Sequence, residues 1–242
     1  MMSGMSALKE NLARVEEQII AACHAAGRAR SSVELMAVSK TYPAETMAEA
    51  AALGLTLFGE NRVQEFQGKT VNLGPKRESM ECHLIGHLQS NKAQRAVELF
   101  YGIDSLDSLK LAERLNDAAG KLGKRLPVLI EVKLSPEETK AGLDPASVDA
   151  AQLLERLPDF AHLSPRGLMT IAPFGVSDDE TRACFRTLHT LRDRWAQVHP
   201  RLDLGVLSMG MSGDFDLAIA EGATRIRVGT ALFGARAYAE KP

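Results

Sequence analysis

VELMAVSKTYPAETMAEAAAL, residues 33–53, joins a short apolar run to a helical one through an abrupt turn. The run from Val33 to Ser39 is almost entirely apolar, which is typical of a strand that is buried on both faces. The stretch from Pro43 to Leu53 has the pattern of a helix that starts at a proline. The segment therefore predicts one strand-helix unit, and Lys40 closes its strand.

The same alternation continues along the rest of the chain. Seven further strand-like runs are expected at residues 55–59, 82–86, 102–106, 128–134, 167–171, 205–209 and 225–230. Helices are expected between them, at residues 62–71, 91–100, 108–122, 145–157, 178–198 and 215–221, with a short one after Thr230. A leading helix from Ser6 to Ala26, ended by Gly27, precedes the first strand.

Such alternation requires parallel strands joined by right-handed crossovers. Either an open doubly wound sheet or a closed barrel satisfies that requirement. Eight repeats in 242 residues, close to the roughly 250 residues typical of the closed form, favour an α/β (β/α)8 TIM barrel with a leading N-terminal helix. Because no linker rich in proline, glycine and serine divides the chain, we expect residues 1–242 to form a single domain.

Charge and composition argue against several classes of function. A formal net charge of -2 and a pI near 6.3 give no basic footprint for nucleic acid or for an anionic membrane. No stretch reaches the roughly 20 apolar residues of a membrane span, and the N-terminus has no apolar core of a secretion signal. We expect a cytoplasmic protein with small-molecule partners.

Polar residues cluster where the predicted strands end. Lys40 ends the first strand, Glu60 and Asn61 follow the second, residues 83–88 span the end of the third, and glycine-bearing turns follow the seventh and eighth. Active sites of this architecture lie at the C-terminal strand ends, with phosphate held after the last two strands. An amine fixed in an enclosed place is a nucleophile toward carbonyl groups. Lys40 therefore predicts a Schiff-base role, in preference to a lysine that extends into solvent.

The two glycine-bearing turns are suited to hold a phosphate. Ser212-Gly213-Asp214 precedes a helical run, and taken alone it would be an ordinary helix cap. Gly229-Thr230 adds a second set of donors on the adjacent strand, where a residue without Cβ lets an anion approach the backbone. Arg225 and Arg227 share a strand face with Gly229, and Arg227 lies nearer the mouth. An amine beside an anion cradle suggests a carbonyl cofactor that carries a phosphate.

A metal site is not indicated. His83 and His87 stand four residues apart, as zinc ligands on a helix do. Gly86 lies between them and no glutamate follows His83, so the HExxH geometry is missing. Cys23, Cys82 and Cys184 are too widely spaced for a paired zinc motif.

Seven segments together resemble the pyridoxal-phosphate homeostasis proteins, also called the proline-synthetase co-transcribed family. The resemblance spans nearly the whole chain and is carried by AVSKTYP, FGENRVQE, HLIGHLQSNK, IDSL, KAGL, RGLMTI and LSMGMSGDFDLAIAEGATRIRVGTALFGAR. It implies a single (β/α)8 barrel, similar to the N-terminal domain of bacterial alanine racemase. It also implies that pyridoxal 5′-phosphate is bound as an internal aldimine.

The resemblance implies roles for individual residues. Lys40 matches the aldimine lysine and Arg227 matches the arginine at the pyridine nitrogen. The phosphate site is matched by Ser212, Gly229 and Thr230. Asn61 and Lys140 fall at other polar positions of the family pattern.

The resemblance leaves open whether the cofactor is turned over or only held. An arginine partner keeps the pyridine nitrogen neutral, which weakens the ring as an electron sink. Alanine racemase also uses a tyrosine from another domain as a second base. We expect that domain to be missing, because the sequence ends at Pro242, and none of Tyr42, Tyr101 and Tyr238 can be assigned the role from sequence.

The expected function is therefore non-enzymatic. We expect a binding protein for pyridoxal phosphate that serves cofactor homeostasis and amino-acid and keto-acid balance, with pyridoxal-phosphate-dependent apo-enzymes as further partners. An amino-acid racemase-like enzyme that uses pyridoxal phosphate is the first alternative. A Schiff-base aldolase that uses Lys40 without any cofactor is the second.

Overall fold

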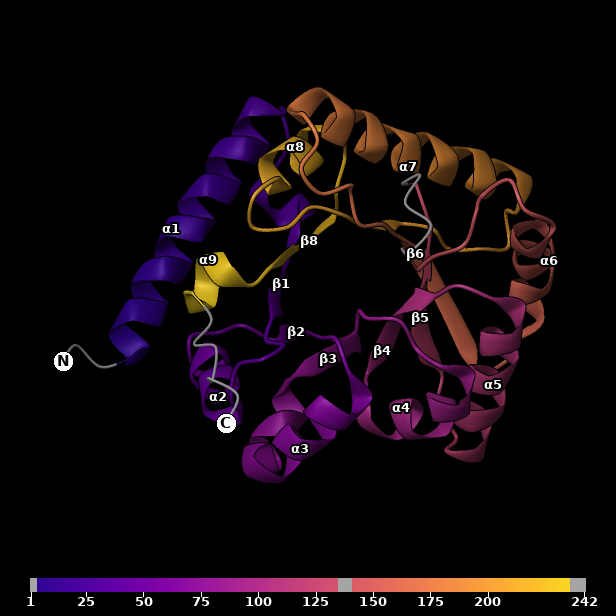
Figure 1. The fold of residues 1–242 in the computed structure, drawn as a ribbon, viewed down its shortest axis with the longest axis horizontal. Coiled ribbons are helices and arrows are strands. Elements are labelled where there is room, and N and C mark those ends of the chain that lie inside the picture. The colour runs from indigo at the N-terminus through magenta and orange to yellow at the C-terminus, as the bar shows by residue number, and fades with distance from the viewer. Residues whose placement is uncertain (1–3, 135–140, 236–242) are drawn as a thin grey trace.

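In the computed structural model, parallel strands close into a barrel and helices surround it (Figure 1). The structure describes residues 4–134 and 141–235. The strands follow one another around the ring in sequence order, and β8 (Arg225–Val228) closes the ring against β1 (Glu34–Val38). This arrangement confirms the predicted α/β TIM barrel.

The remaining strands are β2 (Leu57–Glu60), β3 (Glu81–Leu84), β4 (Gly102–Leu106), β5 (Leu126–Glu131), β6 (Leu163–Met169) and β7 (Val206–Ser208). The α-helices are α1 (Gly4–Ala25), α2 (Ala44–Ala52), α3 (Val63–Leu73), α4 (Ala93–Leu99), α5 (Leu109–Lys121), α6 (Val148–Arg156), α7 (Asp178–Val198), α8 (Phe215–Ala220) and α9 (Thr230–Phe233). Short 3-10 helices lie at η1 (Arg30–Ser32), η2 (Gly74–Ser79), η3 (Ser90–Lys92) and η4 (Leu157–Asp159).

The leading helix α1 is confirmed, and it lies outside the ring beside α8 and α9 (Figure 1). The Asn11 side chain donates to the Leu232 carbonyl of α9 at 2.9 Å. Arg28, just after the helix, donates to the Ile219 carbonyl of α8 at 2.8 Å. These bonds hold α1 against the last two helices, which flank the loops after β7 and β8.

Serine caps fix the starts of three helices. Ser108 Oγ accepts from the Leu111 N–H at the start of α5, and Ser147 Oγ accepts from the Ala150 N–H at the start of α6. Ser177 and Glu180 form a capping box at the start of α7. The cap at Ser147 explains why α6 starts at Val148, three residues after the predicted start at Pro145.

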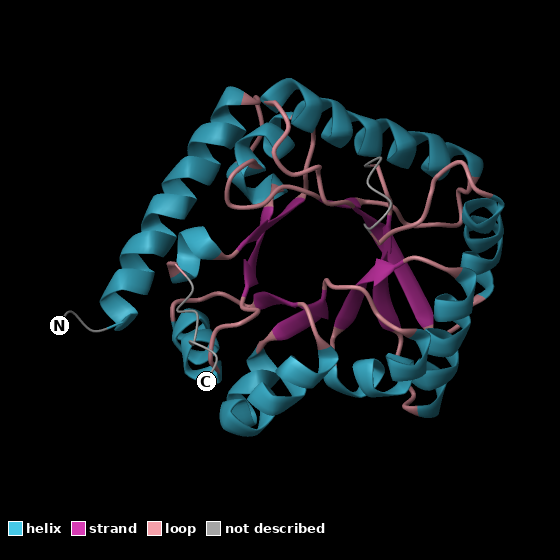
Figure 2. Cartoon of the chain, viewed as in Figure 1, coloured by secondary structure: helices cyan, strands magenta, loops and turns pink. Residues whose placement is uncertain are grey.

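Helices surround the strands of the barrel (Figure 2), and the main apolar core is built from residues of both. It includes Phe58, Phe66 and Phe185, which are fully buried. A second, smaller apolar cluster consists of Met36, Val38, Leu57 and Ile85. The buried apolar side chains of the barrel therefore form two clusters, a large one and a separate cluster of four residues.

Charged residues occupy both ends of two opposite strands. Side chains alternate along a strand, so Glu34 shares its face of β1 with Met36 and Val38, and Lys40 is the next position of that row. On β5 the corresponding row runs from Arg125 through Leu129 to Glu131. β1 and β5 are four strands apart in a closed ring of eight, so they face each other across the barrel.

Two predicted strands differ in their bounds for identifiable reasons. The first ends at Val38, and not at Ser39, because the chain turns at Lys40 and Thr41. The sixth begins at Leu163, four residues before the predicted start, although it contains Pro165. The pairing register with β5 shifts between Pro165 and Gly167, and such a bulge accommodates a proline within a strand.

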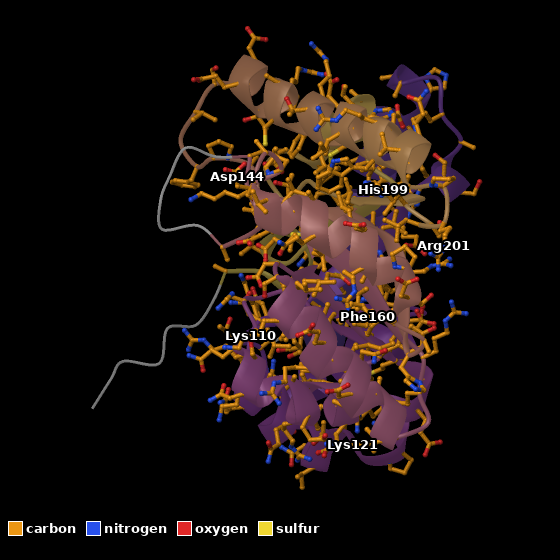
Figure 3. All side chains as sticks on the ribbon, turned by 90° about the vertical axis from the view of Figure 1, so that its right-hand side faces the viewer. Lys110, Lys121, Asp144, Phe160, His199 and Arg201 are labelled. Atoms are coloured by element: carbon orange, nitrogen blue, oxygen red, sulfur yellow. The ribbon has the colours of Figure 1, made fainter. Side chains whose placement is uncertain are left out.

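Figure 3 shows the molecule from the side, with the two ends of the barrel on opposite sides of the view. Lys110 at the start of α5 and Lys121 at its end lie toward opposite ends of the molecule, and His199 and Arg201 lie toward the same end as Lys121 (Figure 3). We call the end where the strands finish the mouth and the end where they begin the base. No helix in the described ranges has the length and apolarity that crossing a bilayer requires.

Candidate functional site

Lys40 lies half-buried at the mouth, in the turn that joins β1 to α2. The turn is fixed on both sides of the lysine. The Ser39 N–H donates to the Gly59 carbonyl of β2 at 3.0 Å, and the Thr41 N–H donates to the Glu65 carboxylate of α3. Thr41 has a φ of 69°, which a β-branched residue rarely adopts. The backbone around Lys40 is thus held in one unusual conformation, as is common near functional groups.

A buried ion-pair network supports this turn. Lys69 Nζ, on α3, lies 2.9 Å from the Ser39 carbonyl oxygen, 2.7 Å from Glu60 Oε1 and 3.0 Å from Glu65 Oε1. The Ser39 hydroxyl donates to Glu60 Oε1 at 2.7 Å. Burial raises the pKa of Glu60, and the charge and hydrogen bond of Lys69 oppose that rise. The network ties the ends of β1 and β2 to α3 on either side of Lys40.

Arg227 is buried and oriented by main-chain and hydroxyl acceptors. Its Nη1 donates to the Ser208 carbonyl at 2.7 Å and to the Ser208 hydroxyl at 2.8 Å. Its Nη2 donates to the Thr170 carbonyl at 2.7 Å. Burial lowers the pKa of the guanidinium, but such a group stays protonated at neutral pH. These bonds leave N–H groups of a fixed cation for a ligand.

Ser212 and the backbone after β8 form a cluster of donors. The Ser212 hydroxyl oxygen accepts from the Gly229 N–H at 3.3 Å and from the Ala231 N–H at 3.4 Å. α8 begins at Phe215, as predicted, and the Ser212 hydroxyl bonds the next strand end and does not cap the helix. A Cβ at Gly229 would lie 3.3 Å from the Val38 carbonyl oxygen, so the glycine permits close packing against β1. We call Ser212, Gly229, Thr230 and the Ala231 N–H the anion cradle.

A cavity of about 200 Å³ opens on the other side of the mouth. Asn61 and Glu131 lie on its wall with His87 and Lys133. Glu131 is 5% exposed and its Oε2 has no partner in the described part of the chain. Burial and the charge of Asp107 raise the pKa of Glu131 to about 7, against the opposing charge of Arg227. This wall offers an acid that titrates near neutral pH.

The structure places the predicted site residues at one end of the barrel. Lys40 follows β1, and the anion cradle follows β7 and β8. β8 pairs directly with β1, and Val228 is the pairing partner of Ala37. Arg227 lies between the cradle and the barrel interior, and Asn61 lies across the mouth after β2. Lys140 is outside the described residues, so its position stays a prediction.

The predicted stretch 83–88 divides between the two ends of the barrel. The sequence predicts the third strand at residues 82–86, whereas β3 runs from Glu81 to Leu84 and contains His83. Its ring bonds Asp104 and lines a cavity at the base, whereas His87 bonds Asp107 at the mouth. The two histidines therefore serve different ends of the barrel. No group of metal-binding side chains is found in residues 4–134 and 141–235.

The sequence analysis did not identify Lys69 and Glu131, which lie beside the predicted site residues. Each of them is a charged residue in an otherwise apolar pattern. Lys69 stands in the buried row of α3 with Val63, Phe66 and Leu73, where an apolar residue is usual. Glu131 ends an otherwise apolar strand, and an acid in such a position needs a reason.

Comparisons with known proteins show the family of the chain. A family model described as "Alanine racemase, N-terminal domain" matches residues 5–237. The pyridoxal phosphate homeostasis protein of Pasteurella multocida is 40% identical over 96% of this chain and 99% of that protein. That of Escherichia coli K12 is 38% identical over 98% and 100%. The chain belongs to the family of the pyridoxal phosphate homeostasis proteins.

Solved structures extend the comparison. PipY of Synechococcus elongatus PCC7942, solved with PLP bound, is 46% identical, with a TM-score of 0.84 over 94% of this chain and 100% of that one. An alanine racemase of Clostridium difficile 630 has a TM-score of 0.74 over 97% of this chain and 58% of the racemase. At 15% identity the racemase shows the shared fold alone. The pyridoxal phosphate homeostasis relatives are named for homeostasis and not for a reaction.

Proposed function

We propose that this chain binds pyridoxal 5′-phosphate at the mouth, holds it through Lys40 and serves cofactor homeostasis. One observation carries the proposal: a fixed amine, a buried arginine and an anion cradle lie at neighbouring strand ends. The PLP-bound structure of PipY, 46% identical to this chain, supports the same assignment. The donors match the ligand, because a phosphate accepts hydrogen bonds and an aldehyde reacts with an amine.

Different residues of the mouth would bind different parts of the cofactor. The Ser212 and Thr230 hydroxyls would donate to the phosphate, which Gly229 lets approach the backbone, and a remaining N–H group of Arg227 would donate to the pyridine nitrogen. Asn61 offers its amide from the opposite wall. When bound, the cofactor supplies an aldehyde that amines attack reversibly, so Lys40 can surrender it to another amine.

We further propose that the protein holds and releases the cofactor without turning over amino acids. A protonated Arg227 keeps a proton off the pyridine nitrogen, which weakens the ring as an electron sink. The candidates for a second base are poorly suited. The Tyr42 hydroxyl donates to the Gly234 carbonyl at 2.7 Å, and Tyr101 lines the base cavity. Tyr238 lies outside the described residues. Pyridoxal-phosphate-dependent apo-enzymes are the recipients that this role requires.

Covalent capture tests the assignment of Lys40. The protein is incubated with pyridoxal phosphate, reduced with borohydride and digested, and the modified lysine is located by mass spectrometry. We expect the adduct on Lys40 and its loss in Lys40→Ala. Lys133→Ala is the matched control, because Lys133 is a second lysine at the mouth. An adduct that persists in Lys40→Ala and disappears in Lys133→Ala would overturn the assignment.

Proton exchange tests the absence of turnover. L- and D-amino acids are incubated with the loaded protein in heavy water, and exchange of the Cα proton is followed by NMR. In parallel, transfer of pyridoxal phosphate to an apo-enzyme is followed by recovery of that enzyme's activity. Transfer without exchange is the expected result. Rapid exchange that vanishes in Lys40→Ala would favour the racemase-like alternative.

A further inference from the structure

A cavity of about 520 Å³ opens at the base, at the opposite end of the barrel from Lys40. Its wall includes the first residues of several strands, among them Glu34 of β1, Glu81 of β3 and Arg225 of β8. None of the residues assigned to the cofactor lies on this wall. The volume falls within the range of about 300–1,000 Å³ that small-molecule sites occupy. The base is therefore large enough for a ligand of its own.

Buried charges line the inner side of this cavity. Arg225 Nε and Nη2 lie 2.9 and 2.8 Å from Glu34 Oε2, and Arg225 Nη1 lies 3.4 Å from Asp104 Oδ2. Asp104 Oδ1 lies 2.7 Å from His83 Nδ1. Burial opposes ionisation of Asp104, but the His83 and Arg225 charges hold its pKa below the ordinary value. An ionised Asp104 only accepts hydrogen bonds, so Nδ1 of His83 carries the proton.

The other ring nitrogen of His83 is left unsatisfied. Nε2 has no hydrogen-bond partner among the residues that the structure describes, although His83 is only 4% exposed. The ring is held in place, because a Cβ at Gly102 would lie 2.6 Å from its Cε1 and the Tyr101 ring packs 5.6 Å away. A ligand in the cavity could supply the partner that this buried ring nitrogen lacks.

The charges around the cavity are arranged with opposite signs on opposite sides. The acids Glu34 and Glu81 stand on β1 and β3, and the half-exposed Tyr101 ring precedes β4. Arg125 precedes β5 and Arg166 stands on β6. Because β1 to β3 face β5 to β7 across the ring, the cavity has an acidic side and a basic side.

The two arginines of the basic side differ in their ion pairing. Arg166 pairs with Asp203 at 2.7 Å, whereas Arg125 forms no ion pair with any residue in the described ranges. Ser164, between them on the wall, adds a hydroxyl. Glu34 is already paired with Arg225, as Arg166 is with Asp203, so the charges that a ligand meets are those of Glu81 and Arg125. A dicarboxylate would meet repulsion from Glu81, and a diamine would meet repulsion from Arg125. Neither single-sign class of ligand suits both sides.

We propose that the base cavity binds a small zwitterion, of amino-acid to dipeptide size. Its cationic nitrogen lies on the side of Glu34, Glu81 and Tyr101, near the unpartnered His83 Nε2 and against the aromatic ring. Its carboxylate or phosphate lies against Arg125 and Ser164. This site is independent of the cofactor at the mouth.

Calorimetric titration of the full chain tests the proposal. The probes are α-amino acids, a dipeptide, an ω-amino acid, phosphoethanolamine, succinate and putrescine, so that the arms separate carboxylate from phosphate and zwitterions from single-sign ions. We expect saturable binding of at least one zwitterion that weakens about tenfold or more in Arg125→Ala and in Glu81→Gln. Both residues are exposed, so the variants should fold. Lys121→Ala, an exposed change elsewhere, should bind as the parent does.

NMR of the imidazole nitrogens gives a second readout that does not depend on heat. The zwitterion that binds in the titration should shift the ¹⁵N resonance of His83 Nε2 when it is added to the parent protein. At the same concentration it should shift that resonance much less in Arg125→Ala. Absence of saturable binding by every zwitterion would overturn the proposal. So would binding that is unchanged in both base variants, or succinate or putrescine binding as tightly as the best zwitterion.

Discussion

Glu131→Gln is expected to stabilise the cofactor-free protein above neutral pH by about 3 kcal/mol. Glu131 is buried at the end of β5, its Oε2 has no partner in the described part of the chain, and glutamine preserves its volume. Burial, reinforced by Asp107, raises its pKa from 4.5 to about 7. A rise of that size, at about 1.4 kcal/mol for each pKa unit, gives the magnitude.

The sign of the pH effect on stability follows from which state, folded or unfolded, binds the Glu131 proton more tightly. The folded-state pKa of Glu131 lies above its unfolded value, so its contribution to stability is fully present below the unfolded pKa of 4.5. That contribution is lost as the pH rises through about 7. Above that range the folded protein contains a buried carboxylate, whereas the glutamine side chain of the variant stays neutral at every pH. The two proteins should therefore be similar in stability in acid and diverge in base.

Thermal and urea unfolding at a series of pH values from acid to base measure the difference. The melting temperature of Glu131→Gln should exceed that of the parent by about 6–12 °C in the basic range, from about 2–4 °C for each kcal/mol in a domain of this size. Glu113→Gln, an exposed change on α5, is the matched control and should show no such divergence. A stability difference that does not change with pH, or a variant less stable than the parent in base, would refute the reasoning.

Three other predictions concern the mouth. Replacing Ser212 or Thr230 with alanine should weaken retention of pyridoxal phosphate by about 0.5–3 kcal/mol, and an unchanged Kd in the double variant, measured by equilibrium dialysis, would rule out the anion cradle. Lys69→Met should destabilise the protein by about 3–5 kcal/mol in urea, since it leaves Glu60 buried without its cation. Adding Glu60→Gln should recover much of that loss, and no recovery would show that the ion pair is not its cause. Thr41→Gly should raise stability by up to about 1 kcal/mol by relieving the left-handed φ, and a large loss in the same assay would contradict that strain.

The closed barrel could be predicted from sequence because alternation is a property of the whole chain. Errors of a residue or two at each strand end do not change the number of repeats. The predicted start of β6 is four residues late because Pro165 is a local signal against a strand, and only the pairing with β5 shows that a bulge accommodates it. Local signals fail where a distant partner decides the conformation.

The same distinction applies to the site. Lys40, Ser212 and Gly229 could be placed at one end because the barrel itself brings strand ends together. The partners of Lys69 and the isolation of Glu131 depend on which side chains meet across elements, and sequence spacing does not give that. The sequence groups His83 with His87 because they are close in the chain, whereas in the structure His83 lines the base cavity and His87 lines the mouth cavity.

The separation of the two cores has an evolutionary consequence. The large apolar cluster, which lies between strands and helices, accounts for most of the buried apolar side chains, whereas the smaller cluster contains four. Folding therefore depends mainly on packing outside the ring. Substitutions among the charged residues inside it, such as Arg225 and Asp104 at the base, would change the lining of a cavity without changing that packing. Such a barrel can acquire new ligand preferences by changing its lining while its scaffold is inherited intact.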